Sequence, residues 1–538
     1  MERFAADLAT MVRTPLEPEH VAALRRAGEI RRFEAGDFVQ EPGEAIELFH
    51  YVMSGEVEAV DVRTGQRYGI ATLGPGQFGG ELAFLSGGLS LSGLRACEQS
   101  EVLCVPRQTV LKLMSDIPEM GDIIVTVFAA RRRRALEDSD GALTLIGAEV
   151  SRDIRHVAGF AARNRIPFRE IALDSDEAKA LAAECGLAEA EPGVIFGRER
   201  KIEPPTPRGV AETLGFDLST QGDTFHDVLI VGGGPAGVAA GVYAGAEGLS
   251  ALVLEDLAIG GQAGTSSRIE NYMGFPTGIS GGDLVGRGEV QAMKFGTRFA
   301  VPRRVEALRQ CGDKYFHAKL EDGGEISAKA LVVATGVQYR RLPLEGLERF
   351  EGAGVYYAAT ELEQRWCRDQ EVAVIGGGNS AGQAAMFLAR GCAHVHVLVR
   401  GAALASSMSD YLVQRLTSHP HITVHTRTEV LELHGDAVLE GVTICDKASG
   451  QDWRLKTSAL FVMAGAAPNT GWLSGLVDLD DKGFVVTGQQ AGGRTTYETS
   501  CPGVFAVGDV RAGSVKRVAS AVGEGSVVMS AVWDHVHA

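Results

Sequence analysis

The chain has few cysteines, and none of them form a pair along the sequence. Eight stand in 538 residues, at positions 97, 104, 185, 311, 367, 392, 445 and 501. These positions offer no C-x-x-C pair, no zinc-like spacing and no dense disulfide framework. Their scatter argues against a disulfide-stabilised scaffold and a C-x-x-C electron relay, and we expect no metal site.

The chain also lacks an excess of positive charge and long apolar runs. Its 52 lysines and arginines are outnumbered by 69 aspartates and glutamates, giving a formal net charge of -17. Such a charge repels nucleic acid and anionic lipid, so neither is expected as a partner. No apolar run reaches the roughly 18 residues of a membrane span, and the first residues lack the pattern of a secretory signal. We therefore expect a cytoplasmic protein without membrane contact.

Glycine, in contrast, is abundant, with 68 residues, and many of them follow apolar stretches. The apolar run 227–231 fits a buried parallel strand, and a G-x-G-x-x-G loop at 232–237 follows it and opens a helix of small residues. Such a loop holds a dinucleotide pyrophosphate at the helix N-terminus. The next strand ends in Glu255, an acid placed to bond a ribose hydroxyl, which suits the adenosine of FAD.

A second glycine loop repeats the pattern. The run 371–375 leads into a loop at 376–381, and the strand after it, 394–399, ends in Arg400. Two loops imply two dinucleotides, because each holds one pyrophosphate. An arginine at the end of that strand can pair with the 2'-phosphate of NADP, so the pattern favours NADPH over NADH.

From about residue 227 to residue 535 the chain resembles the low-molecular-weight thioredoxin reductases. Beyond the two loops, the shared motifs are GGQ at 260–262, IENYMGF at 269–275, ATG at 334–336 and GVFAVGD at 503–509. The resemblance implies an FAD domain interrupted by an NADPH domain, and a homodimer. It places FAD against Gly232, Gly234, Pro235, Ala236, Gly237, Glu255, Gly261, Gln262, Asn271, Thr335, Gly336, Gly508, Asp509, Arg517, Val518 and Ala519. It places NADPH against Gly376, Gly378, Asn379, Ser380, Ala381 and Arg400, with possible help from Ser406 and Ser407.

One motif of that family is altered in a way that changes the expected chemistry. Its C-A-T-C reads A-A-T-E here, so that Ala358 and Glu361 stand where the two redox thiols belong. Neither side chain accepts electrons. Cys367, a few residues later, is expected to be a packing residue, because a reactive thiol must be an exposed thiolate.

These features predict an FAD-dependent NAD(P)H oxidoreductase that passes a hydride from NADPH to flavin and on to an unidentified acceptor, without an internal dithiol. An alanine-sized slot near Tyr356 and Tyr357 would admit a quinone, oxygen, a small electrophile or a one-electron carrier. Three alternatives stay open. They are a ferredoxin- or flavodoxin-NADP reductase, a non-catalytic flavin redox sensor, and a thioredoxin-disulfide reductase that works through a partner's thiols.

The first 138 residues predict short strands separated by glycine turns, followed by a helical run over 109–136. The turn glycines and GPGQFGGEL at 74–82 resemble the cyclic nucleotide-binding domain of the catabolite activator family. That family's phosphate-binding arginine is displaced, with Ser90 near its place and Arg95 five residues later, whereas its ribose-binding glutamate is present as Glu81. A cyclic nucleotide and another small ligand both stay open. The arginines at 131–134 are expected to form a solvated helix end.

Residues 142–216 predict the order βαβαββα, which resembles the thioredoxin and glutaredoxin fold, with Pro192 at the family's cis-proline position. The family's reactive cysteine follows the first strand, where this chain reads AEVSRD at 148–153. A hydroxyl such as that of Ser151 cannot carry electrons, so this segment is expected to have a structural or docking role.

The expected fold class is therefore an α/β multidomain protein. Two Rossmann-like domains of the thioredoxin reductase type follow a β jelly-roll and a thioredoxin-like domain. The expected boundaries are 1–138 for the cyclic-nucleotide-binding-like domain, 139–222 for the thioredoxin-like domain, 223–343 with 472–538 for the FAD domain, and 344–471 for the NAD(P)H domain.

Overall fold

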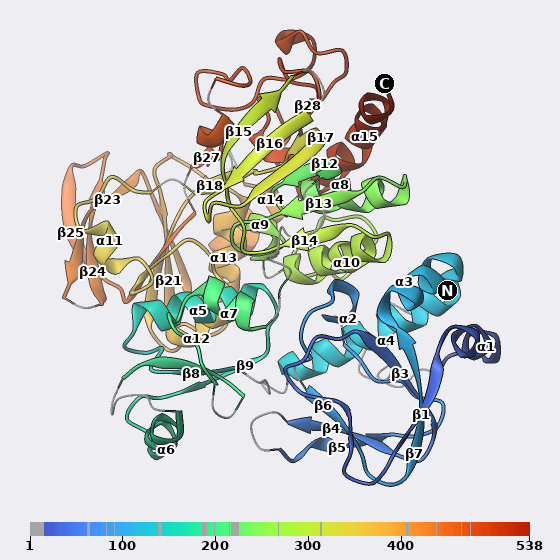
Figure 1. Cartoon of the computed structure of the whole chain (residues 1–538). Coiled ribbons are helices and arrows are strands. Elements are labelled where there is room, and N and C mark those ends of the chain that lie inside the picture. Colours follow the sequence, from blue (N-terminus) through green and yellow to red (C-terminus); the bar gives the residue numbers. More distant parts are fainter. Residues whose placement is uncertain are drawn as a thin grey trace.

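The computed structural model (Figure 1) describes residues 15–538. Short gaps in this description fall at 62–64, 82, 91, 138–142, 186–190, 198–199, 215, 217–224, 267, 313–314, 340, 405–407, 437, 464 and 474. Within the described part, no helix is both long and apolar enough to cross a membrane.

The N-terminal part consists of two antiparallel sheets, ordered β1-β7-β3 and β2-β6-β4-β5. Four phenylalanines meet between them and the helices that follow, with ring centroids 5.3 to 6.0 Å apart, and they form the centre of this core. The glycine turns space these strands as the sequence predicts. The elements are α1 (Pro18–Ala27), β1 (Glu29–Phe33), β2 (Phe38–Gln40), β3 (Leu48–Ser54), β4 (Val57–Asp61), β5 (Arg67–Leu73), α2 (Ala83–Ser86), β6 (Ser92–Ala96) and β7 (Ser100–Pro106).

The single helical run expected over 109–136 is wrong, because it is two helices, α3 (Arg107–Asp116) and α4 (Pro118–Glu137). Pro118 has no N–H to continue the hydrogen-bond ladder, and its ring forces the residue before it out of the helical region. The expectation of a solvated end is also wrong for Arg131. Its guanidinium donates to the carbonyls of Gly80 and Phe78 at 2.9 and 2.8 Å and lies over the Phe78 ring.

The thioredoxin-like segment has the predicted element order around one sheet, β11-β10-β8-β9. Ser151 caps its first long helix by accepting a hydrogen bond from the Ile154 N–H at 3.4 Å, at the place where the family has its reactive cysteine. Among the described residues, the cis peptide bonds precede Pro204 and Pro302, not Pro192. The elements are β8 (Leu143–Ile146), α5 (Arg152–Arg163), β9 (Phe168–Ile171), α6 (Asp176–Cys185), β10 (Gly193–Phe196), β11 (Arg200–Lys201) and α7 (Pro207–Thr213).

The first glycine loop lies in a mixed sheet ordered β14-β13-β12-β17-β16-β15, with β28 paired to β17. Strands β12 and β13 are buried on both faces, as their apolar runs predict. The elements before the second loop are β12 (Phe225–Val231), α8 (Pro235–Ala246), β13 (Ala251–Leu254), α9 (Gly261–Gly264), α10 (Gly281–Lys294), β14 (Arg298–Ala300), β15 (Val305–Cys311), β16 (Tyr315–Leu320), β17 (Glu325–Val333) and β18 (Val337–Tyr339). The chain returns to this sheet through β27 (Ala466–Pro468), η3 (Gly471–Leu473), η4 (Gly488–Ala491), β28 (Val504–Ala506), η5 (Gly508–Val510) and α15 (Val518–His537).

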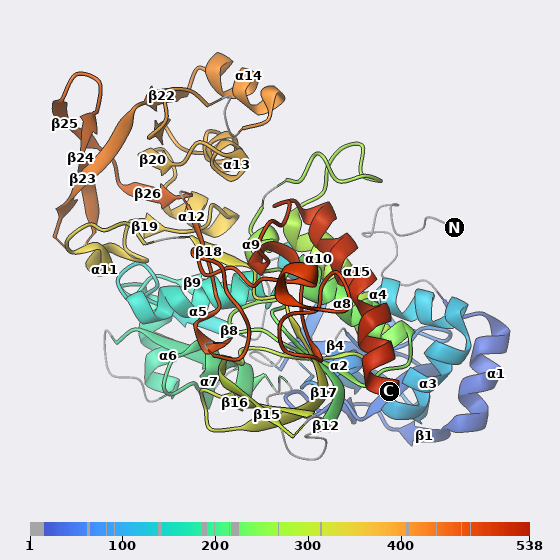
Figure 2. The same cartoon turned by 90° about the horizontal axis from the view of Figure 1, so that it is seen from above.

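The second glycine loop lies in a parallel sheet ordered β19-β26-β20-β21-β22, beside a three-stranded antiparallel sheet, β23-β24-β25. Seen from above, this part stands away from the N-terminal sheets (Figure 2). Its elements are α11 (Leu347–Phe350), β19 (Val355–Tyr356), α12 (Glu361–Trp366), β20 (Glu371–Ile375), α13 (Asn379–Leu388), β21 (His394–Val399), α14 (Asp410–Ser418), β22 (Ile422–Thr426), β23 (Thr428–Gly435), β24 (Leu439–Asp446), β25 (Gln451–Lys456) and β26 (Ala459–Val462).

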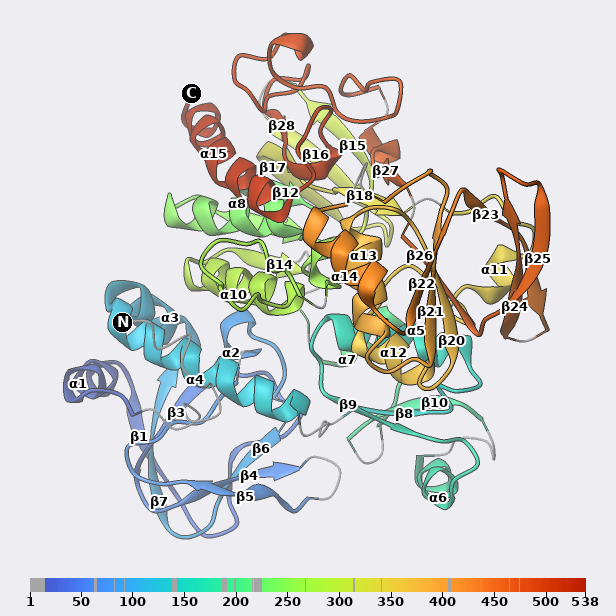
Figure 3. The same cartoon turned by 180° about the vertical axis from the view of Figure 1, so that it is seen from behind.

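Helices α10 and α5 both join the N-terminal half to the dinucleotide-binding half. Helix α10 lies against α3 and α4 (Figure 3), where Val290 is buried in the N-terminal core and Lys294 pairs with Asp122 at 2.6 Å. Helix α5 of the thioredoxin-like segment packs on both nucleotide-binding parts, because Asn164 donates to the Leu257 carbonyl at 3.0 Å and Leu362 joins its hydrophobic core. The thioredoxin-like segment therefore forms one wall of the space between the two glycine loops.

Candidate functional site

Both glycine loops open onto one cavity of about 2720 Å³. The same cavity is lined by helix α5 and by the segment in which the redox cysteines are missing. The predicted site residues on its wall are Gly232, Gly234, Pro235, Ala236, Glu255, Gly261, Gln262, Asn271, Thr335, Gly336, Ala358, Asn379, Ser380, Gly508, Asp509, Arg517, Val518 and Ala519. Gly237, Gly376, Gly378, Ala381 and Arg400 are not on the wall.

Glycine is needed at the three positions of the first loop for different structural reasons. A Cβ at Gly232, whose φ is +108°, would lie 2.3 Å from the Ala334 carbonyl oxygen, and one at Gly237 would lie 1.8 Å from the Gly232 oxygen. A Cβ at Gly234 would meet nothing within 4 Å. The outer two glycines therefore permit close backbone packing, while Gly234 leaves room at the N-terminus of α8. This space fits a dinucleotide pyrophosphate, which helix N–H groups bind.

Glu255 lies at the carboxyl end of β13, as predicted, and its carboxylate is buried. One oxygen accepts a hydrogen bond from the Gly233 N–H at 2.7 Å and the other from the Leu257 N–H at 3.2 Å. Burial, with a smaller contribution from the Asp256 carboxylate, raises the pKa of Glu255. Each carboxylate oxygen can accept a further hydrogen bond, so the side chain supports the loop and keeps acceptor capacity for a ribose hydroxyl.

Asp509 is positioned by a residue that the sequence analysis missed, Glu524 of α15. The Glu524 carboxylate accepts from the Gly508 N–H at 2.7 Å and pairs with the Arg511 guanidinium at 2.7 Å. These bonds fix η5, which holds Asp509 on the cavity wall, where burial raises the pKa of its carboxyl. The available signal was an acid between Gly523 and Gly525 in a helix of mostly small and apolar residues, and its partner Arg511 lies 13 residues away.

The second loop is supported in a similar way. Gly376 has a φ of +146°, and a Cβ there would lie 2.7 Å from the Met463 carbonyl oxygen. The side-chain oxygen of Asn379 accepts from the Ser409 N–H at 2.7 Å, so it braces the loop as well as facing the cavity. Arg400 is exposed just after β21. Its predicted helpers, Ser406 and Ser407, lie outside the described residues.

The segment in place of the redox pair lies on the cavity wall and is held by its own packing and hydrogen bonds. Ala358 and Ala359 are buried, and Thr360 caps helix α12, whose Leu362 N–H donates to its Oγ1 at 3.3 Å. The buried Glu363 carboxylate accepts from the Thr360 N–H at 2.8 Å. Glu361 is the first residue of α12, and its side chain lies outside the described part.

The two tyrosines beside this segment both line the cavity. Tyr356 packs on Phe461 and Trp366, with ring centroids 5.4 and 6.1 Å away. The Tyr357 hydroxyl donates to a Glu351 carboxylate oxygen at 2.9 Å. These contacts hold both tyrosine rings in place on the cavity wall beside Ala358 and Ala359.

Cys367 is a packing residue in the structure. It is 3% exposed, and burial raises the pKa of its thiol to about 12. A thiol of that pKa is almost wholly protonated at neutral pH and is a poor nucleophile.

We therefore expect Cys367→Ala to keep the wild-type rate of NAD(P)H oxidation within about twofold, since the thiol takes no part in electron transfer. The rate of NAD(P)H oxidation by the variant and by the wild type is measured by steady-state kinetics with an artificial acceptor. A loss of more than tenfold, with flavin content and folding intact, would show that the thiol carries electrons.

In the N-terminal part, the side chains near the expected phosphate-binding position already bind other groups of the chain. Arg95 pairs with Glu58 at 2.5 Å, and Arg67 pairs with the same carboxylate at 2.7 Å. The buried Ser90 hydroxyl donates to the Ser92 carbonyl at 2.6 Å. Arg95, which follows Ser90 by five residues, is therefore already paired with an acid.

Comparison with known proteins agrees with this geometry. Residues 226–525 match the family model described as pyridine nucleotide-disulphide oxidoreductase, and residues 30–116 match the cyclic nucleotide-binding domain. The chain is 35% identical over 303 residues to the thioredoxin reductase of Mycolicibacterium smegmatis, which covers 56% of this chain and 94% of that protein. It is 30% identical over 310 residues to the NADH dehydrogenase of Bacillus subtilis, covering 58% of this chain and 58% of that protein.

A solved thioredoxin reductase of Lactococcus lactis, in its FR conformation, superposes with a TM-score of 0.54 at 29% identity, over 58% of this chain and 99% of that one. The chain belongs to the pyridine nucleotide-disulphide oxidoreductase family. It is an FAD-dependent oxidoreductase of the thioredoxin reductase type that uses NAD(P)H, and it carries an N-terminal cyclic nucleotide-binding domain. The predicted fold class is confirmed in these respects.

Proposed function

We propose that this protein oxidises NADPH through FAD and reduces an acceptor that is not one of its own disulfides. The observation that carries the proposal is the cavity shared by both glycine loops, whose described lining contains no cysteine. Ala358 stands where the first thiol of the family belongs. An electron path that ends at the flavin therefore needs an acceptor from outside the chain.

The chain's residues bind and orient the two cofactors. When bound, FAD supplies the redox chemistry, taking a hydride from the nicotinamide and giving electrons to the acceptor. The N-termini of α8 and α13, with Gly234 and Asn379 on the cavity wall, suit the two pyrophosphates because free helix N–H groups bind anions. Glu255 serves the ribose of FAD, and Asp509 serves the ribityl chain by family resemblance.

Anaerobic stopped-flow reduction by NADPH tests the proposal. We expect rapid bleaching of the flavin, followed by many turnovers once an added quinone, oxygen or one-electron carrier is present. Slow bleaching without turnover would favour a redox sensor. Turnover only with a ferredoxin or flavodoxin, or only with a thioredoxin-like disulfide, would replace the proposal with one of those reductase functions.

The choice of NADPH over NADH rests on Arg400. Its exposed side chain at the end of β21 suits a 2'-phosphate, and an exposed ion pair of this kind contributes about 1 kcal/mol. We expect Arg400→Ala to raise the KM for NADPH about fivefold and to leave the KM for NADH unchanged. Equal changes in the KM for NADPH and for NADH would show that Arg400 does not bind the 2'-phosphate.

We further propose the division of the chain at residues 138, 222, 343 and 471, a cytoplasmic location, and a homodimer. The family resemblance supports the dimer, and light scattering of the purified protein measures its mass.

For the N-terminal domain we propose a small ligand other than a cyclic nucleotide, because Glu58 already neutralises Arg95. Tight calorimetric binding of cyclic AMP or cyclic GMP would contradict this.

A further inference from the structure

Helix α5 turns one side toward the flavin cavity although it belongs to the thioredoxin-like segment. Its other side is apolar and buried in the core of that segment. The residues of the cavity side recur every three or four positions, the spacing of one helix face. Arg152, Arg155 or His156, Gly159 and Arg163 follow this spacing, and Phe160 and Ala162 of α5 also line the cavity.

Arg163 is distinguished by its lack of a partner. Arg155 donates to the Gly352 carbonyl at 2.8 Å, and Arg169 donates to Thr144 at 3.0 Å and pairs with Glu177. In the described part of the chain, no carboxylate or carbonyl accepts from the Arg163 guanidinium. It is partly buried, whereas Arg152 on the same face is exposed to water. Because it lines the cavity, this guanidinium can pair with an anionic group that enters there.

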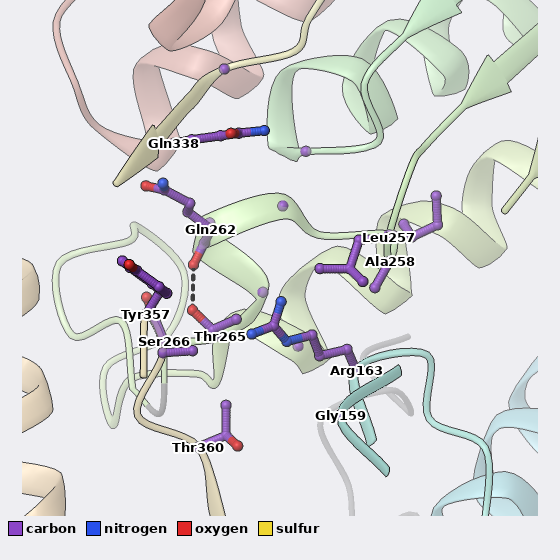
Figure 4. A pocket seen from close by; sticks show the side chains of 18 of the residues that line it. Gly159, Arg163, Leu257, Ala258, Gln262, Thr265, Ser266, Gln338, Tyr357 and Thr360 are labelled. Carbon is purple, nitrogen blue, oxygen red and sulfur yellow. Dashed lines mark hydrogen bonds between the residues drawn. The ribbon is translucent and has the colours of Figure 1, made fainter. Parts of the chain in front are cut away.

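Figure 4 shows where this guanidinium points. It extends from α5 toward Thr265 and Ser266, with Thr360 on the opposite wall. The Thr265 hydroxyl donates to the Gln262 carbonyl at 2.8 Å, so this wall continues directly into α9, the predicted flavin-contacting turn. We call the part of the cavity lined by Gly159, Arg163, Thr265, Ser266 and Thr360 the side chamber, and it adjoins the segment that has lost its thiols.

Gly159, one turn before Arg163, leaves open space on the cavity wall. Glycine in a helix interior is less stable than alanine, and some helix glycines are required because a side chain would clash. Gly241 is such a case, since a Cβ there would lie 3.2 Å from Thr297. A Cβ at Gly159 would meet nothing within 4 Å. The chain's own atoms would therefore tolerate a side chain here, and the glycine leaves open space on the same helix face as Arg163.

We propose that this side chamber binds the anionic group of the electron acceptor, with Arg163 as its counter-ion and Gly159 as the space for its body. The inference rests on the proposed function and names the class of acceptor, an organic anion such as a sulfonated or carboxylated quinone. Reduced flavin gives two electrons and two protons to the quinone, whose two carbonyls become the hydroxyls of the quinol, and FAD is regenerated. The charged group stays at Arg163 and does not react.

The experiment compares charged and uncharged acceptors on the holoenzyme. Naphthoquinone sulfonate and uncharged menadione are assayed with wild type, Arg163→Gln, Arg163→Lys and Arg152→Gln. Arg163→Gln is expected to raise the KM for the sulfonate about tenfold or more and leave menadione unchanged. Lysine is expected to restore part of the loss, and the exposed Arg152→Gln is the matched control.

Two further measurements do not depend on turnover. Naphthalene sulfonate, which cannot be reduced, should bind the oxidised holoenzyme in calorimetry and bind Arg163→Gln about tenfold more weakly. Gly159→Ala should raise the midpoint of thermal unfolding, because alanine favours the helix, yet weaken sulfonate binding. Raised stability with unchanged binding would overturn the role of Gly159.

The outcomes separate the two proposals. If NADPH fails to reduce the wild-type flavin, the proposed function fails. If the flavin is reduced and menadione turns over, but Arg163→Gln and wild type bind the sulfonate equally, only the anion site fails. Loss of FAD from Arg163→Gln would place the guanidinium on the cofactor, and this too would overturn the inference.

Discussion

Gly234→Val is expected to give a folded protein that purifies without FAD. The substitution adds a branched side chain at the N-cap of α8, where a Cβ meets no atom of the chain within 4 Å, so the fold tolerates it. The same side chain fills the space of the pyrophosphate and screens the helix N–H groups that bind it. We expect FAD affinity to fall by at least about 100-fold, which corresponds to about 3 kcal/mol.

Flavin absorbance of the purified protein and calorimetric titration with FAD measure this effect, and circular dichroism checks the fold. Gly74→Val is the matched control, because Gly74 also has open space around its Cβ but lies in the N-terminal part. Gly237→Val is the opposite control, since its Cβ would lie 1.8 Å from a carbonyl oxygen and should prevent folding. If the Gly234→Val protein were yellow and saturated with FAD, the first glycine loop would not be part of the FAD-binding site.

Glu524→Ala is expected to destabilise the FAD-binding part by about 3–5 kcal/mol, because it leaves a largely buried cation and a buried backbone N–H without their acceptor. The side chains of the pair are 18% exposed for Arg511 and 10% for Glu524, so water compensates little. Since the same carboxylate holds the Gly508 N–H, η5 should loosen and FAD should bind more weakly as well.

Denaturant unfolding of the flavin-free protein measures the stability change, and FAD titration measures the second effect. Glu524→Gln keeps an acceptor for Gly508 and should lose less than the alanine variant. Glu429→Ala breaks the exposed pair with Lys447, whose side chains are 33% and 49% exposed, and should cost less than about 1 kcal/mol. If Glu524→Ala cost no more than Glu429→Ala, the buried pair would not be what holds η5.

Local patterns were sufficient for most of the elements around the site. The apolar runs at 227–231 and 371–375 form buried parallel strands, and the glycine loops follow them directly. The thioredoxin-like order was also predicted, because each strand and helix has its own period in the sequence. The continuous helix predicted through Pro118 was an error of interpretation, since proline is itself the local signal for a break.

The missed features all depend on partners that are remote in sequence. Glu524 reads as an isolated acid until the fold brings it to Gly508 and Arg511. Arg131 reads as part of a basic helix end until its guanidinium meets two carbonyls some 50 residues away. Such pairs share no periodicity, so no pattern in the sequence can supply them.

By itself the sequence determined the two dinucleotide loops, the family and the loss of the redox thiols, because each is written in consecutive residues with a fixed spacing. Only the tertiary structure decided that both loops share a cavity, that α5 forms one of its walls, and that Arg163 points into it without a partner among the described residues. The physical reason is that a cavity is made by side chains from several segments at once. Its shape and charge follow from how those segments pack, not from the order of residues within any one of them.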